Sequence, residues 1–127
     1  QEAEEFVIKN SLGVEFKGFI EEIDPFLQRA SFVFVSRYLG ILESLMSKKY
    51  VLAVYNNEIK KDYLKMTPFS EYISISKDHI ELQNELQKII EDNNLKNERI
   101  KKGFNWVKDK TWDNMTLLYL NLWKIKV

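Results

Sequence analysis

The sequence predicts an α/β domain built on a Rossmann-like parallel sheet with helices on both faces. Two continuous apolar segments rich in β-branched and aromatic residues, 32–35 and 50–54, are typical of strands buried on both faces. Apolar residues recur at helical spacing over 41–46, so these segments form a strand, helix, strand crossover. A length of 127 residues favours one domain with a single hydrophobic core.

Three elements are expected before this crossover. Residues 2–10 have helical spacing, and Gly13 is available for a left-handed cap after them. Alternating apolar residues over 14–17 predict a strand. Asp24 and Pro25 then suit a helix start, with Asp24 as the N-cap and Pro25 at the first helical position.

A helix, a strand and a second helix are expected next. Residues 57–65 predict a short helix, which ends near Pro68 because proline disfavours helix in the residue before it. Residues 72–75 alternate as a short strand. Asp78 begins a capping-box pattern, and an apolar stripe over 82–90 predicts the helix that follows.

The chain is expected to close with helices over 95–107 and 112–123. In the last helix Trp112, Leu118 and Leu122 share one side. We expect these three side chains to pack inward, because large apolar residues dominate the area of a core.

Composition excludes several classes of function. Nineteen basic and nineteen acidic residues give a formal charge of zero, which removes the overall electrostatic drive for nonspecific nucleic-acid binding. The chain contains no cysteine, so thiolate metal sites and cysteine nucleophiles are excluded, and a cytoplasmic location is expected. The apolar runs are far shorter than a membrane span, and residues 1–11 are acidic and polar, unlike a signal peptide.

The charges are unevenly distributed along the chain, although their sum is zero. Residues 1–30 carry seven acids and three bases, whereas residues 94–127 carry three acids and eight bases. The basic end could approach anionic lipid headgroups in a peripheral membrane contact, although a lysine-rich helix surface is more often just solvated.

Local motifs support few other chemistries. His79 is the only histidine, so it has no second histidine or cysteine with which to form a metal or catalytic set, and we expect it to be an exposed residue beside a helix cap. The four glycines lie too far apart for a dinucleotide or P-loop motif.

The segment from Ser36 to Asn57 is the best candidate for binding. It leaves the carboxyl end of a predicted parallel strand, where open α/β sheets bind ligands, and it enters a helix whose first N–H groups favour phosphate. Glu43 lies one turn into that helix and could accept hydrogen bonds from two ribose hydroxyls. A glutamate there is more often a surface or dipole-complementing residue, and spacing alone leaves both interpretations open.

The order of the segments resembles the donor-binding half of GT-B glycosyltransferases, especially glycosyltransferase family 4 and its group 1 domain. Three consecutive segments carry the resemblance. They are a strand over 30–36, a helix over 40–49 that contains a glutamate, and a second strand over 50–54. Weaker likenesses follow the family order elsewhere in the chain: 12–20, 82–91, 111–113 and 119–123. Each motif is weak alone, and together they span nearly the whole chain.

Two departures from the family pattern stand out. The family's first glutamate precedes the second by eight residues, and Val35 holds that position here. The family's donor half also opens with two more strands and a basic pair that neutralises the diphosphate, so residues 1–127 are expected to be a fragment that also lacks the acceptor domain. Such a fragment alone is not expected to turn over substrate.

The resemblance implies a retaining glycosyltransferase that requires no metal or other cofactor. The expected ligands are a nucleotide sugar and, through the missing domain, a glycan or lipid-linked acceptor. Glu43 would hold the ribose, Arg37 would supply positive charge, and Gly18 and Phe19 would border the base. The diphosphate would face N–H groups in the first helical turns: Leu39, Gly40, Ile41 and Leu42.

Tyr55 and Asn56 would line the same cleft, and their interpretation as plain turn residues is equally open. The alternative for the whole chain is a noncatalytic interaction domain that kept the scaffold and lost the chemistry. The absent first glutamate favours this alternative.

Overall fold

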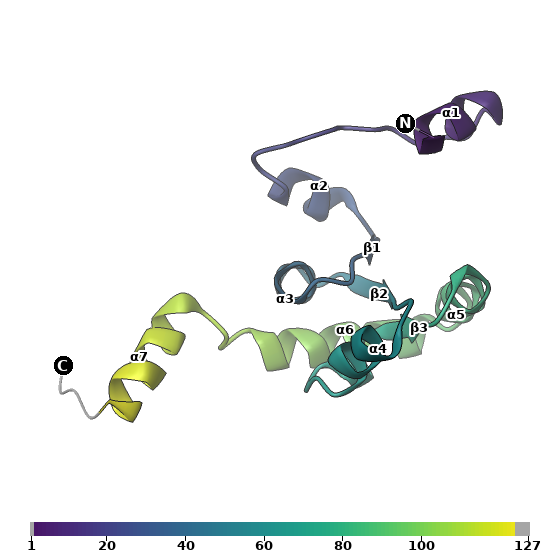
Figure 1. The fold of residues 1–127 in the computed structure, drawn as a ribbon. Helices are drawn as coiled ribbons and strands as arrows, with labels where there is room; N and C mark the ends of the chain where they lie inside the picture. Colours follow the sequence, from purple (N-terminus) through teal and green to yellow (C-terminus); the bar gives the residue numbers. More distant parts are fainter. Residues whose placement is uncertain (1, 124–127) are drawn as a thin grey trace.

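The computed structural model describes residues 2–123 and contains a three-stranded parallel sheet in the order β1-β2-β3 (Figure 1). The strands are β1 (Phe32–Phe34), β2 (Tyr50–Val54) and β3 (Ser74–Ser76). Val33 pairs with Val51, and Ala53 pairs with Ile75. The predicted α/β class is therefore confirmed.

Helices precede, connect and follow the strands: α1 (Glu2–Lys9), α2 (Asp24–Arg29), α3 (Tyr38–Met46), α4 (Glu58–Lys65), a 3₁₀ turn (Ser70–Tyr72), α5 (His79–Glu91), α6 (Asn93–Val107) and α7 (Trp112–Leu122). Four of them have a side-chain cap, in which an oxygen of Asn57, Asp78, Asp92 or Thr111 accepts a hydrogen bond from a backbone N–H of the first turn. Within residues 2–123, no helix has both the length and the apolar character needed to cross a membrane.

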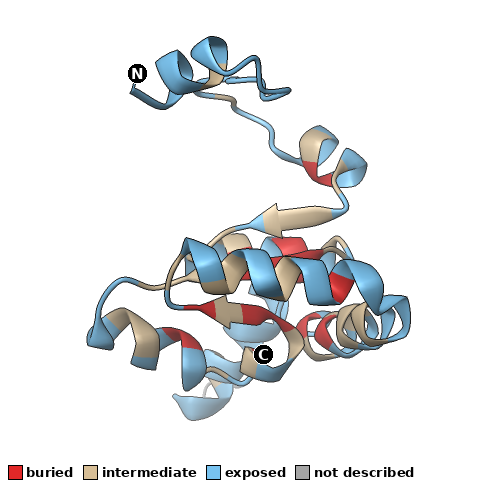
Figure 2. Cartoon of the chain, turned by 90° about the vertical axis from the view of Figure 1, so that its right-hand side faces the viewer, coloured by how far each residue is buried: buried red, intermediate tan, exposed pale blue. Residues whose placement is uncertain are grey.

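Buried residues lie mainly in the sheet and in the helices packed against it (Figure 2). The central strand β2 separates two hydrophobic clusters. Side chains alternate across a strand, so Val51 and Ala53 face one cluster while Tyr50 and Leu52 face the other. α3 and α4 contribute to the first cluster, and Ile89 of α5 contributes to the second. Helices thus cover both faces, as the sequence predicts.

Helix α6 passes the amino ends of the strands and joins the two clusters. A guanidinium N–H of Arg99 donates to the Tyr50 hydroxyl over 2.7 Å, and the Lys96 ammonium lies 5.7 Å from the ring centroid of Phe32. The buried Tyr50 hydroxyl in turn lies 2.7 Å from the Ser74 hydroxyl. Gly103 lets α6 approach α3, because a Cβ at this position would lie 2.8 Å from Cδ2 of Leu45.

The structure contradicts three details expected near the N-terminus. Residues 14–17 form no strand but part of an exposed irregular segment, because an alternating pattern becomes a strand only beside a partner. The left-handed residue after α1 is Ser11, with φ of 53°, and not Gly13. Asp24 is the first residue of α2, and the N-cap is Ile23, which makes no side-chain capping bond.

The expectation for the last helix is also wrong. Trp112, Leu118 and Leu122 are 79%, 54% and 66% exposed, and no residue of α7 is buried. The spacing puts these three residues on one side of the helix, but periodicity does not show whether another element covers that side.

We expect two aromatic truncations to differ strongly in cost. Phe69 is fully buried, with its ring centroid 5.5 Å from those of both Tyr38 and Trp106, so Phe69→Ala should cost about 3–5 kcal/mol of unfolding free energy. Trp112→Ala should cost under about 1 kcal/mol, because the ring is already in solvent. Urea unfolding of both variants measures this difference, and equal losses would contradict the exposed placement of α7.

Candidate functional site

The carboxyl edge of the sheet is the region where α3, α4 and α5 begin. In a parallel sheet, the helix that follows each strand starts at this edge, so its N–H groups gather there. Asn57 caps α4 and Asp78 caps α5 through their side chains. Arg37, the N-cap residue of α3, makes no side-chain capping bond. Among these three helix starts, only that of α3 lacks a side-chain acceptor from its own cap.

Lys60 brings a positive charge to this edge. Its ammonium donates a hydrogen bond to the Ser36 carbonyl oxygen over 2.6 Å, and it lies 4.6 Å from the ring centroid of Tyr63. The Ser36 hydroxyl oxygen accepts a hydrogen bond from the Val54 N–H over 3.0 Å. These contacts tie the ends of β1 and β2 to α4, two residues before α3 begins.

A hollow of about 360 Å³ opens where β2 and β3 end. Its lining combines amides, a tyrosine and charged side chains from both strand ends and from α4: Tyr55, Asn56, Asn57, Glu58, Lys61, Lys77 and Asp78. Ser76, the last residue of β3, is fully buried, and its hydroxyl has no hydrogen-bond partner among the described residues. A buried hydroxyl without a partner is uncommon in folded proteins, and Ser76 is not among the residues that line this hollow.

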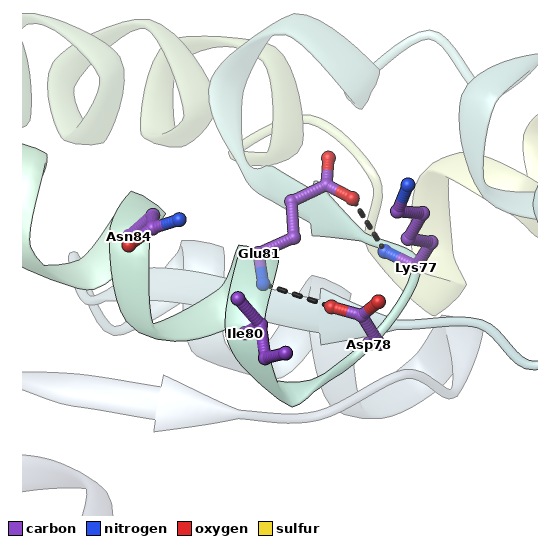
Figure 3. A pocket seen from close by; sticks show the side chains of 5 residues that line it. All are labelled: Lys77, Asp78, Ile80, Glu81 and Asn84. Carbon is purple, nitrogen blue, oxygen red and sulfur yellow. Dashed lines mark hydrogen bonds between the residues drawn. The ribbon is translucent and has the colours of Figure 1, made fainter.

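The start of α5 borders a different hollow, and its carboxylates are already engaged (Figure 3). The Asp78 carboxylate accepts from the Glu81 N–H over 2.9 Å, and the Glu81 carboxylate accepts from the Lys77 N–H over 3.2 Å. The predicted capping box is thus present with its return bond displaced by one residue, from Asp78 to Lys77. Because side-chain oxygens occupy these donors, an anion gains less here than at α3.

Glu43 lies on an exposed part of α3, beside a groove of about 400 Å³. Apolar side chains of α3, of the end of α6 and of the first turn of α7 dominate the lining: Leu39, Leu42, Met46, Val107, Trp112 and Met115. Polar residues complete it: Asp24, Tyr38, Glu43, Ser47, Lys110 and Thr111. The arrangement places one carboxylate at the rim of a mainly apolar groove.

Gly40 is explained by packing against the preceding strand. A Cβ at this position would lie 2.5 Å from Cγ2 of Val35, so the glycine allows α3 to sit close to the chain leaving β1. Val35 itself packs against the cluster that contains Ile41 and Leu45. An apolar side chain therefore fills the position at which the family pattern has its first glutamate.

The structure divides the predicted donor-binding residues among separate places. Leu39, Leu42 and Glu43 share the groove, whereas Tyr55 and Asn56 share the hollow at the strand ends. Ile41 is buried, and its N–H already donates to the Arg37 carbonyl oxygen over 2.9 Å, so it is not a free phosphate donor. Arg37 is exposed beside the start of α3.

Gly18 and Phe19 lie in the exposed segment between α1 and α2, away from the sheet (Figure 1). Phe19 is 93% exposed and lines neither the groove nor the hollow. Their expected position beside a base stays a prediction without structural support. His79 is exposed, as expected from its place beside the cap of α5.

Sequence reasoning missed Lys60 and Trp112 as candidate site residues. Lys60 follows the cap residue Asn57 by three positions, a spacing that could have indicated a side chain near the helix start. Trp112 was expected in the core, and no local signal indicates that its helix would instead border the groove beside Glu43. Both positions follow from contacts between segments far apart in the chain.

Comparisons of the chain with protein-family models, with curated proteins and with solved structures find no match.

We expect Gly40→Ala to lower the unfolding free energy by about 1–3 kcal/mol, because the added methyl group collides with Val35. Adding Val35→Ala to the same chain should recover part of this loss, because it removes the atom that the methyl group meets. Gly13→Ala is the matched control, since a Cβ there meets nothing within 4 Å. Thermal or urea unfolding measures all three, and a stabilising Gly40→Ala would contradict the close approach.

Proposed function

We propose that the chain is the nucleotide-sugar-binding region of a glycosyltransferase involved in glycan or glycolipid assembly. The observation that carries the proposal is the Lys60 ammonium, held 2.6 Å from the Ser36 carbonyl oxygen beside the uncapped start of α3. A fixed cation and helix N–H groups at one sheet edge suit a diphosphate. The family resemblance of the segments around α3 supplies the identity of the ligand class.

The groove beside Glu43 suits the nucleoside part of such a donor. Glu43 is five residues beyond Tyr38, which puts it about 7.5 Å further along the axis of α3 at the usual helical rise. Its carboxylate can accept hydrogen bonds from two ribose hydroxyls, and the apolar lining with Trp112 can take the flat face of a base. A donor lying along α3 would thus place its diphosphate near Arg37 and Lys60.

The hollow lined by Tyr55 and Asn56 then suits the transferred sugar. Amide and hydroxyl groups can exchange hydrogen bonds with sugar hydroxyls, and this hollow opens at the same edge as the start of α3. Retention of configuration and independence from metal are expectations from the resemblance. The acceptor would be bound by a further domain.

A noncatalytic interaction domain is the second candidate, and Val35 favours it. The family's first carboxylate orients the donor sugar, and here an apolar side chain packs at that position. Calorimetric titration with UDP, GDP and ADP and with their sugar conjugates separates the two candidates. Saturable binding of one donor supports the transferase region, and absence of binding to every donor supports the interaction domain.

We expect Glu43→Gln to raise the donor dissociation constant by about 10- to 100-fold, because a hydrogen bond to a charged group is worth about 1.5–3 kcal/mol. Stability should barely change, since Glu43 is exposed. If the carboxylate only complements the helix dipole, the variant should instead lose up to about 1 kcal/mol of stability with donor affinity intact. Titration and thermal unfolding of the same protein distinguish these results.

We expect Lys60→Gln to weaken donor binding by about tenfold and to reduce the dependence of that binding on salt, because one fixed charge near the diphosphate is lost. Lys88→Gln is the matched control, because Lys88 is an exposed lysine in the last turn of α5. Equal affinities for the two variants would remove Lys60 from the proposed site. Unfolding curves identify any change in affinity that comes only from the lost contact with Ser36.

A further inference from the structure

Tyr50 carries a fully buried hydroxyl group that the proposed donor site does not use. Tyr50 is the first residue of β2 and Ser74 is the first residue of β3, so both lie at the amino ends of neighbouring strands. The two side chains are 0% and 2% exposed, and their hydroxyl oxygens are 2.7 Å apart. We define the hydroxyl bridge as these two hydroxyl groups.

A charged side chain contacts each end of the hydroxyl bridge. At one end the Arg99 guanidinium, from the middle of α6, donates to the Tyr50 hydroxyl oxygen over 2.7 Å. At the other end the Ser74 hydroxyl donates to Oε2 of Glu85, from the middle of α5, over 3.1 Å. Arg99 and Glu85 are both partly buried. The ion pairs within residues 2–123 involve other side chains, so this cation and this anion are connected through the two hydroxyls.

The chemistry of the four groups fixes the direction of each hydrogen bond. A guanidinium only donates, so the Tyr50 oxygen accepts from Arg99. An ionised carboxylate only accepts, so the single Ser74 hydroxyl proton is directed to Glu85. The contact between the two hydroxyls must then use the Tyr50 proton, which Tyr50 donates to Ser74 Oγ. All three donors therefore point from the cation toward the anion, an alignment in which each hydrogen bond polarises the next.

We infer that Arg99 and Glu85 form an ion pair bridged by two hydroxyl groups, which fastens α6 to α5 across the amino ends of β2 and β3. The bridged pair positions α6, whose last residue, Val107, lines the groove beside α3. The inference does not depend on the proposed donor site, because none of the four bridged residues lines the groove or the hollow.

Three independent hydrogen bonds would behave differently from a bridged ion pair. If each bond acted alone, the loss of stability on replacing Arg99 would be the same whether or not Glu85 kept its charge. In a bridged pair, each charge stabilises the orientation that the other requires. Removing one charge therefore lowers the contribution of the other, although their hydrogen bonds are made to different hydroxyls.

A double-mutant cycle on the full chain tests the inference by urea unfolding. Arg99→Met and Glu85→Gln should be non-additive, so the unfolding equilibrium constant of the double variant should be about fivefold lower than the two single effects predict. The same cycle in a Tyr50→Phe background should be additive within about twofold, because this substitution opens the hydroxyl bridge and keeps the ring. The matched control is Glu58→Gln, which changes an exposed glutamate at the start of α4, at the opposite end of the sheet. Its effect should add to that of Arg99→Met.

Proton NMR gives a readout that does not depend on unfolding. A buried, hydrogen-bonded Tyr50 hydroxyl proton should exchange slowly with water and give a separate signal, which is identified by its loss in Tyr50→Phe. Glu85→Gln should shift this signal through Ser74, because the charge at the end of the bridge polarises both hydroxyls. Glu58→Gln should leave the signal in place.

Several results would overturn the inference. They are additive losses in the original background, coupling of the same size in the Tyr50→Phe background, and a Tyr50 hydroxyl signal that is absent from the original chain or unmoved by Glu85→Gln. If Tyr50→Phe fails to fold, Ser74→Ala opens the bridge at its other hydroxyl and should abolish the coupling in the same way. Coupling that survives Ser74→Ala would equally contradict a bridged pair.

Discussion

Burial of β2 on both faces is the constraint on which the other elements depend. Four residues of β2 are almost inaccessible to solvent: Tyr50, Val51, Leu52 and Ala53. β2 pairs in parallel with β1 along one side and with β3 along the other. Parallel pairing requires crossovers, and α3 and α4 supply them. Each face of β2 then needs a cover, which α3 provides on one side and α5 on the other.

The chemistry at the carboxyl edge follows from this arrangement. Because both crossovers return to the amino edge, α3 and α4 must begin where β1 and β2 end, which brings Lys60 to the Ser36 carbonyl oxygen. The amino edge has a different character. There α6 passes close to the strands, and the Arg99 guanidinium donates a hydrogen bond to the Tyr50 hydroxyl. The carboxyl ends of the strands, which have the Lys60 ammonium and an open hollow beside them, are where parallel sheets ordinarily bind ligands.

The contact between Gly40 and Val35 affects both the packing of α3 and the proposed donor site. An acidic side chain in place of Val35 would enter the space against which Gly40 packs, where the present side chain belongs to the cluster around Ile41 and Leu45. Burying a carboxylate there without a partner would be costly. The apolar Val35 side chain therefore stabilises the junction of β1 and α3, and it places no carboxylate at this point. This apolar packing is the physical basis of the proposed interaction-domain alternative.

The sequence alone determined the elements whose signals are local. The buried strand 50–54 is continuous and apolar, and Asp78 caps its helix through the N–H of a residue three positions away, so distant contacts were not needed to predict these two elements. Tertiary structure decided the rest. Residues 14–17 alternate like a strand, yet they have no strand beside them, and α7 has an apolar side that nothing in the described chain covers. Lys60 reaches Ser36 across 24 positions of sequence. Pairing, covering and charge placement depend on which distant segments meet, and periodicity within one segment carries no information about its partners.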